Sequence, residues 1–153
     1  MFDVLVYLFE TYYDPQACPT DDVLANKLAA VGFESDEIQH ALDWLKGLGE
    51  STQAHTFIGQ PRCSHSMRIY TVEEQHYFDP QALGFIHFLE SSNVLTPLLR
   101  EILIERAIAI KEPPLSVEKL KIIALIILWR HEVEIDHLIF EELISYHEEE
   151  RAH

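Results

Sequence analysis

The chain has 153 residues, of which 48% are hydrophobic and 10% aromatic. This length suits one domain, or two very small ones that share a core, and the apolar content excludes a disordered chain. Acidic residues number 26 against 11 basic ones, so the formal net charge is −15. A field of that sign repels nucleic-acid phosphates and anionic membrane surfaces, and it favours solubility and basic protein partners.

Cysteine content and hydropathy predict a soluble cytoplasmic protein without membrane contact. Cys18 and Cys63 are too few for a disulfide framework and are expected to be plain thiols. Residues 1–9 are apolar, but they lack the basic segment with which a signal peptide begins. The longest apolar run, residues 122–129, is far shorter than the roughly 20 residues that span a bilayer.

The first fifty residues predict three helices. Apolar residues at helical spacing mark a helix over residues 2–12, and two proline-containing turns follow it. Thr20 is the expected N-cap of a second helix that Gly32 closes. A third helix begins at Ser35, and the glycines of residues 47–49 are expected to end it.

The second and third helices form a helix-turn-helix-like hairpin. In a DNA-binding protein the second helix of such a pair enters the major groove and needs Arg, Lys, Asn or Gln on its outer side. Here the helix carries Asp36, Glu37 and Asp43 on that side, and Lys46 is its single base. The pattern therefore favours a packing motif over a DNA-recognition unit.

Residues 51–70 predict either a linker or a small β-hairpin. Residues 53–58 can pair as a strand with the alternating residues 67–70, which would add a wing to the three-helix unit. The loop between the two strands is long for a hairpin. The candidate binding residues of this winged-helix-like arrangement are Arg62, Arg68, Tyr70 and Lys46.

Cap signals divide the rest of the chain into helices. Thr71 and Glu74 have the spacing of a capping box. Asp79 and Thr96 each precede a proline, which suits the first position of a helix. Ser116 is the expected cap of the most hydrophobic helix in the chain.

These signals predict a mainly α protein with three parts. Residues 1–50 form the N-terminal three-helix unit, residues 51–70 the linker or hairpin, and residues 71–153 a C-terminal helical bundle. The helix over residues 120–129 is apolar nearly all round, so it is expected at the centre of the bundle. A last amphipathic helix covers residues 135–146.

Cys63 and His65 are the nearest approach to a metal site. Structural zinc needs four ligands, usually with a Cys-x2-4-Cys pair, and the chain has no second cysteine in reach of Cys63. Cys63 and His65 are therefore a weak zinc candidate, and an ordinary polar loop is the preferred interpretation.

The chain carries no catalytic signature. It has no glycine-rich phosphate loop, no Gly-x-Ser-x-Gly, no Walker motif and no dinucleotide fingerprint. Nothing basic lies near Cys18 in the sequence to lower its pKa, so a reactive thiol is not expected. The sequence predicts neither an enzyme nor an obligatory cofactor.

Several blocks resemble the Smg family of bacterial proteins. They include MFDVLVYLFE at residues 1–10, SMRIYTVEE at residues 66–74, Gly32-Phe33 and Gly84-Phe85, so the likeness spans nearly the whole chain. The resemblance implies a bacterial cytoplasmic protein whose genes often lie near genes for DNA processing. It implies no particular activity and carries over no catalytic residue.

Two functions follow from these observations. The first is a non-enzymatic, acidic helical adaptor that binds a basic protein, since an acidic surface speeds association with such a partner. The alternative is a degenerate winged-helix-like nucleic-acid-binding protein linked to DNA processing, which would use Arg62, Arg68 and Lys46. Three bases supply only about three phosphate contacts, so that complex would be weak and salt-sensitive. The charge favours the adaptor.

Overall fold

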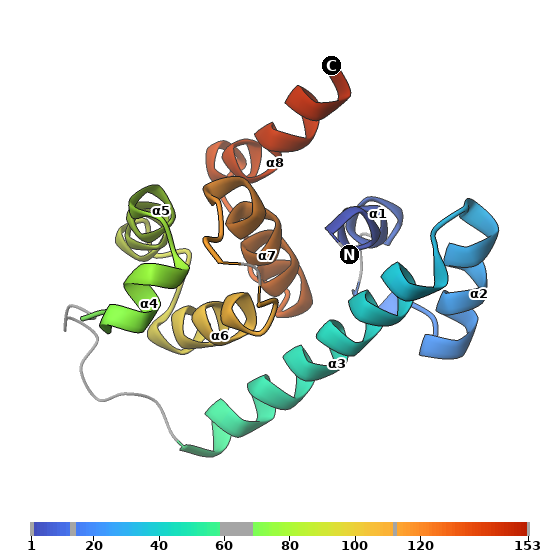
Figure 1. Cartoon of the computed structure of the whole chain (residues 1–153), viewed down its shortest axis with the longest axis horizontal. Coiled ribbons are helices and arrows are strands. Elements are labelled where there is room, and N and C mark those ends of the chain that lie inside the picture. The colour runs from blue at the N-terminus through green and yellow to red at the C-terminus, as the bar shows by residue number, and fades with distance from the viewer. Residues whose placement is uncertain (1, 13–14, 59–68, 112, 153) are drawn as a thin grey trace.

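The computed structural model describes residues 2–12, 15–58, 69–111 and 113–152, and within these ranges every regular element is a helix (Figure 1). The predicted mainly α fold is confirmed. The described elements are α1 (Phe2–Thr11), the 3-10 turn η1 (Pro15–Ala17), α2 (Asp21–Val31), α3 (Ser35–Ile58), α4 (Val72–Tyr77), α5 (Pro80–Ser91), α6 (Pro97–Ile108), α7 (Val117–Arg130) and α8 (His137–Ala152).

The winged-helix-like hairpin is not supported. Residues 53–58, predicted as its first strand, belong to α3, which runs for 24 residues as far as Ile58. Residues 69–70, from the second predicted strand, have no strand conformation, and residues 59–68 lie outside the described part of the chain. The sole strand-like feature among the described residues is an isolated parallel bridge between Phe78 and Leu115.

α3 continues through Gly47 and Gly49, where the sequence predicts its end. A glycine in a helix interior costs about 1 kcal/mol relative to alanine. However, α3 packs along α6, and Trp44, Leu48 and Ser51 of α3 are all buried. Because tertiary packing supplies most of the stability of helices in proteins, these contacts outweigh the two glycines.

The two glycines have different surroundings, which provides a matched test. A Cβ at Gly47 would overlap Nη1 of Arg106 and lie 3.0 Å from its Cζ, whereas a Cβ at Gly49 would meet open space. We expect Gly49→Ala to raise the free energy of unfolding by about 0.5–1 kcal/mol, because alanine restricts the unfolded chain. Gly47→Ala should lower it by up to about 1 kcal/mol, because Arg106 must give up its hydrogen bond to α3.

Urea unfolding followed by circular dichroism compares the two alanine variants with the unaltered protein. Equal stabilisation by both substitutions would contradict the close approach of Arg106 to Gly47.

Local caps account for where most of the capped helices begin. The predicted capping box of α4 is present: the Glu74 backbone N–H donates to Thr71 Oγ1 at 3.2 Å, and the Thr71 N–H donates to Glu74 Oε2 at 3.0 Å. Thr20 has the extended backbone of an N-cap, but its side chain makes no cap hydrogen bond. Three other predicted caps accept from the backbone N–H three residues later: Asp79, Thr96 and Ser116.

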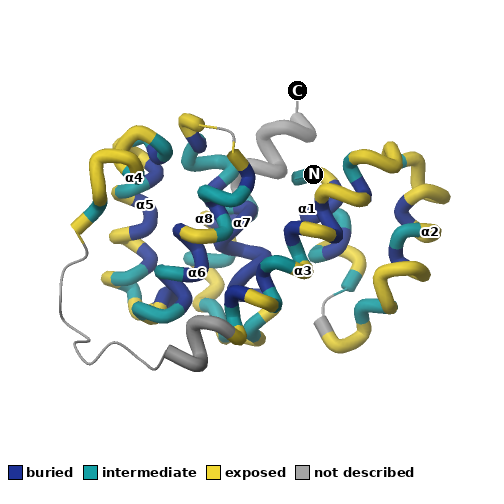
Figure 2. Tube along the Cα trace, turned by 60° about the horizontal axis from the view of Figure 1, so that its bottom comes forward, coloured by how far each residue is buried: buried dark blue, intermediate teal, exposed yellow. Residues whose placement is uncertain are grey.

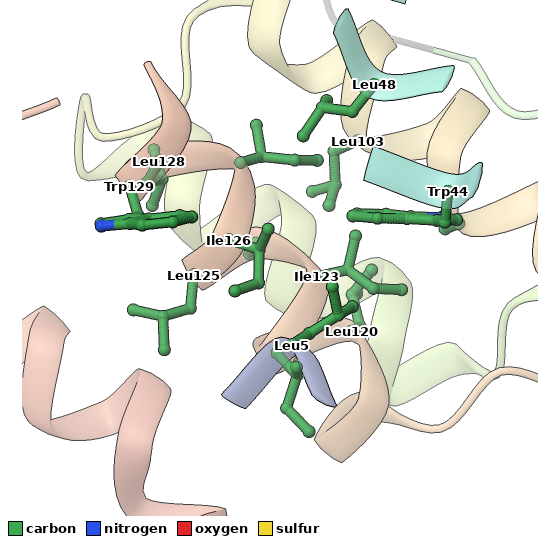
Figure 3. Packing of buried hydrophobic residues seen from close by; sticks show 14 of the residues in the cluster. Leu5, Trp44, Leu48, Leu103, Leu120, Ile123, Leu125, Ile126, Leu128 and Trp129 are labelled. Carbon is green, nitrogen blue, oxygen red and sulfur yellow. The ribbon is translucent and has the colours of Figure 1, made fainter. Parts of the chain in front are cut away.

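α7 occupies the centre of one continuous hydrophobic core. Residues 122–129 are all buried, and α7 packs against α1, α5, α6 and α8. In Figure 3 its side chains lie between Leu5 of α1, Leu103 of α6, and Trp44 and Leu48 of α3. Contacts with several helices thus explain the all-round apolar sequence.

No helix in the described ranges combines the length and the apolarity that crossing a membrane requires.

Candidate functional site

The helix-turn-helix-like hairpin consists of α2 and α3. Gly32 closes α2 with φ at 117° in the left-handed region that glycine adopts without steric cost. Phe33 then packs edge-on against Tyr7 of α1, with ring centroids 5.7 Å apart. α2 buries only Leu24 and Leu28, and most of its length is exposed in Figure 2. The hairpin therefore presents a large part of its surface to solvent.

Three carboxylates lie in a line along the outer side of α3. Asp36, Asp43 and Glu50 are exposed and follow one another at intervals of seven residues. Seven residues make nearly two helical turns, so successive carboxylates stand on one side of the helix, about 10.5 Å apart along its axis. Gln39 lies between the first two and donates to Asp43 Oδ1 at 2.8 Å. We call Asp36, Asp43 and Glu50 the acidic face.

The opposite side of α3 is anchored to α6. Trp44 Nε1 donates to the backbone carbonyl of Arg106 at 3.0 Å, and Arg106 Nη1 donates to the backbone carbonyl of Trp44 at 3.2 Å. Nearly two turns further along α3, Ser51 Oγ donates to Glu105 Oε1 at 2.8 Å. These contacts determine which side of α3 faces solvent, and they leave the acidic face outside.

Several basic side chains that the structure describes are engaged within the protein. Arg100, for example, is buried and lies 3.3 Å from Glu90 and 3.1 Å from Glu101. The engaged residues include Arg100, Arg106, Lys119 and Lys121. Because these bases are occupied, they do not neutralise the acidic face.

The structure describes two of the four candidate binding residues. Lys46 is exposed on α3 and lines a small pocket. Tyr70 is half-buried just before α4, and its backbone carbonyl accepts from Gln75 Nε2 at 3.1 Å. The other two, Arg62 and Arg68, lie outside the described residues, as do the zinc candidates Cys63 and His65.

Where side chains are described, no three His, Cys, Asp or Glu residues gather closely enough to hold a metal ion. Cys18, the cysteine that the structure describes, is half-buried in the segment between η1 and α2. Burial raises the pKa of its thiol, the charge of Arg130 acts to lower that pKa, and Asp21 acts to raise it. A raised pKa leaves less thiolate, so Cys18 is a poor nucleophile.

Two of the arrangements described above carry no signal in the sequence. Arg106 meets Trp44 and Gly47 across the α3–α6 contact, and Arg130 shares a pocket with Lys46. Each pair joins residues that lie far apart in the chain, on helices that do not follow one another in sequence. Only packing of the helices brings them together.

Comparisons with known proteins cover the whole chain. A family model described as "Protein of unknown function (DUF494)" matches residues 1–153. The chain is 52% identical over 153 residues to "Protein Smg homolog" of Bordetella avium, and 46% identical over 153 residues to that of Methylibium petroleiphilum. In both cases the match covers 100% of each chain. No solved structure matches.

Proposed function

The chain belongs to the DUF494 family, as its resemblance to Smg proteins predicts, and we propose that it is an acidic helical adaptor that binds a basic protein partner in the bacterial cytoplasm. The observation that carries this proposal is the acidic face of α3. Its three carboxylates are exposed and evenly spaced on a helix whose other side is fixed to α6.

Electrostatics supports a basic protein as the partner. A net charge of −15 steers positively charged surfaces toward the chain. An exposed ion pair is worth only about 0.2–1 kcal/mol, so the acidic face selects and orients a partner and does not supply the whole affinity. Neighbouring α2 exposes Val23 and Val31 by 45% and 52%. These side chains offer the apolar contact that an interface also needs.

The same face argues against the nucleic-acid alternative. α3 is the helix that a helix-turn-helix protein would place in the major groove, where the helix approaches phosphates on both sides. Asp36, Asp43 and Glu50 would be repelled there, and Lys46 is the single base of α3. An adaptor therefore fits the described surface better than a nucleic-acid binder.

The adaptor role is tested by affinity capture from a nuclease-treated bacterial lysate. We expect the unaltered protein to retain a basic protein, and we expect the triple variant Asp36→Asn, Asp43→Asn, Glu50→Gln to bind it about tenfold more weakly, from three exposed pairs. A matched triple variant removes three exposed acids elsewhere: Asp3→Asn, Glu73→Gln and Glu134→Gln. This control should retain the partner, since it loses the same charge without altering the acidic face.

Two results would contradict the proposal. One is a captured protein that binds the acidic-face variant and the control variant equally. The other is tight binding of duplex DNA by the purified protein at physiological salt, weakened by Arg68→Ala, which would favour the nucleic-acid alternative.

A further inference from the structure

A pocket of about 300 Å³ lies where α1, α2, α3 and α7 meet. Its apolar wall includes Leu8, Leu24 and Trp129, which are 1%, 2% and 8% exposed. The volume is at the small end of the range of about 300–1,000 Å³ for ligand sites. The pocket therefore suits a small molecule with an apolar body.

Two cations line the same pocket. Lys46 lies in the middle of α3, and Arg130 is the last residue of α7. Neither side chain forms an ion pair with a described residue. The chain has 26 acidic residues against 11 basic ones, yet the described lining of this pocket holds two basic residues and one acidic residue. The two basic residues supply the charge that an anionic head group would need.

We propose that this pocket binds a small organic monoanion: a carboxylate attached to an apolar chain. The carboxylate lies at Lys46 and Arg130, and the apolar chain contacts the leucines and Trp129. None of the three residues of the acidic face lines this pocket.

The pocket favours one negative charge over two. Asp21 also lines it, so the charged lining residues sum to +1, from two cations and one carboxylate. A dianionic phosphate would leave one charge unbalanced beside Asp21. The net charge of the whole protein opposes any anion at long range, but physiological salt screens that field beyond about 8 Å. The nearby cations therefore decide the affinity.

Cys18 provides a reporter for occupancy. It lines the pocket, and its thiol, whose pKa burial raises, takes no covalent part in binding. A ligand in the pocket covers the thiol and should slow its alkylation. With Cys63→Ser as the background, Cys18 is the single cysteine of the chain, so the rate of alkylation measures its protection directly.

The experiment measures octanoate binding by calorimetry, with octanol and octyl phosphate for comparison. We expect octanoate to bind more tightly than either. Lys46→Gln and Arg130→Gln should each weaken octanoate binding by about threefold to tenfold, the range for a charge-assisted contact at a partly exposed site. Their combination should remove the preference for octanoate over octanol. Lys27→Gln, which removes an exposed lysine of α2 outside the pocket, is the control and should bind normally.

A pocket-filling variant gives an independent test. Gly49 lines the pocket, and a Cβ at this position meets open space, so Gly49→Leu should fold. Its side chain should block octanoate binding. Octanoate should then no longer slow the alkylation of Cys18. The proposal is overturned if octanoate binds Gly49→Leu as well as the unaltered protein, or if the two cation variants bind it normally. Tighter binding of octyl phosphate than of octanoate would overturn the choice of a monoanion.

Discussion

Trp44→Ala should lower the free energy of unfolding by about 3–5 kcal/mol, the range for removing a large buried aromatic side chain. Trp44 is 4% exposed at the contact between α3 and α6. Its Nε1 donates to the Arg106 carbonyl at 3.0 Å, and the Arg106 guanidinium lies 5.9 Å from the ring centroid. The alanine variant loses the apolar burial, the hydrogen bond and the cation–π contact together. Urea unfolding measures the loss.

Trp44→Phe separates packing from hydrogen bonding. Phenylalanine keeps much of the apolar area but leaves the Arg106 carbonyl without its donor, so we expect a smaller loss of about 1–3 kcal/mol. Phe88→Ala, at an aromatic residue that is 44% exposed, is the control for aromatic truncation and should cost less than either change. A loss below about 1 kcal/mol for Trp44→Ala would refute the anchoring of α3 on α6, because truncation of a buried tryptophan lowers the free energy of unfolding by about 3–5 kcal/mol.

Arg100→Leu should lower the free energy of unfolding by about 3 kcal/mol, because it leaves carboxylates without their counter-charge. Arg100 is 9% exposed, and its Nε lies 3.3 Å from Glu90 Oε1. That oxygen is buried and accepts no hydrogen bond from the described residues. The positive charge of the Arg100 guanidinium is thus the main compensation for the buried Glu90 carboxylate.

A double-mutant cycle tests this interpretation of Arg100. Replacing the pair together, as Arg100→Leu with Glu90→Leu, removes the uncompensated charge of Glu90 and should restore part of the lost stability. Lys27→Leu, at an exposed base, should change stability by less than about 0.5 kcal/mol. Strictly additive losses from the Arg100 and Glu90 substitutions would show that the two residues are not coupled.

The sequence alone predicts the features that depend on neighbouring residues. The caps at Thr71, Asp79, Thr96 and Ser116 each join groups three residues apart, so their residue types are sufficient to locate the helix starts. Gly32 closes α2 for the same local reason. The acidic composition of the outer side of α3 is also visible in the sequence, because exposed polar residues recur at helical spacing.

The tertiary structure decided the features that depend on residues far apart in the chain. The sequence predicts that α3 ends at Gly47 and Gly49 and that a linker or β-hairpin follows. Instead α3 continues to Ile58, because contacts with α6 compensate for two weak helix formers. The pocket exists because helix packing brings Lys46 of α3 beside Arg130 of α7. Local propensity is weak, about 1 kcal/mol or less per residue, so long-range packing prevails wherever the two conflict.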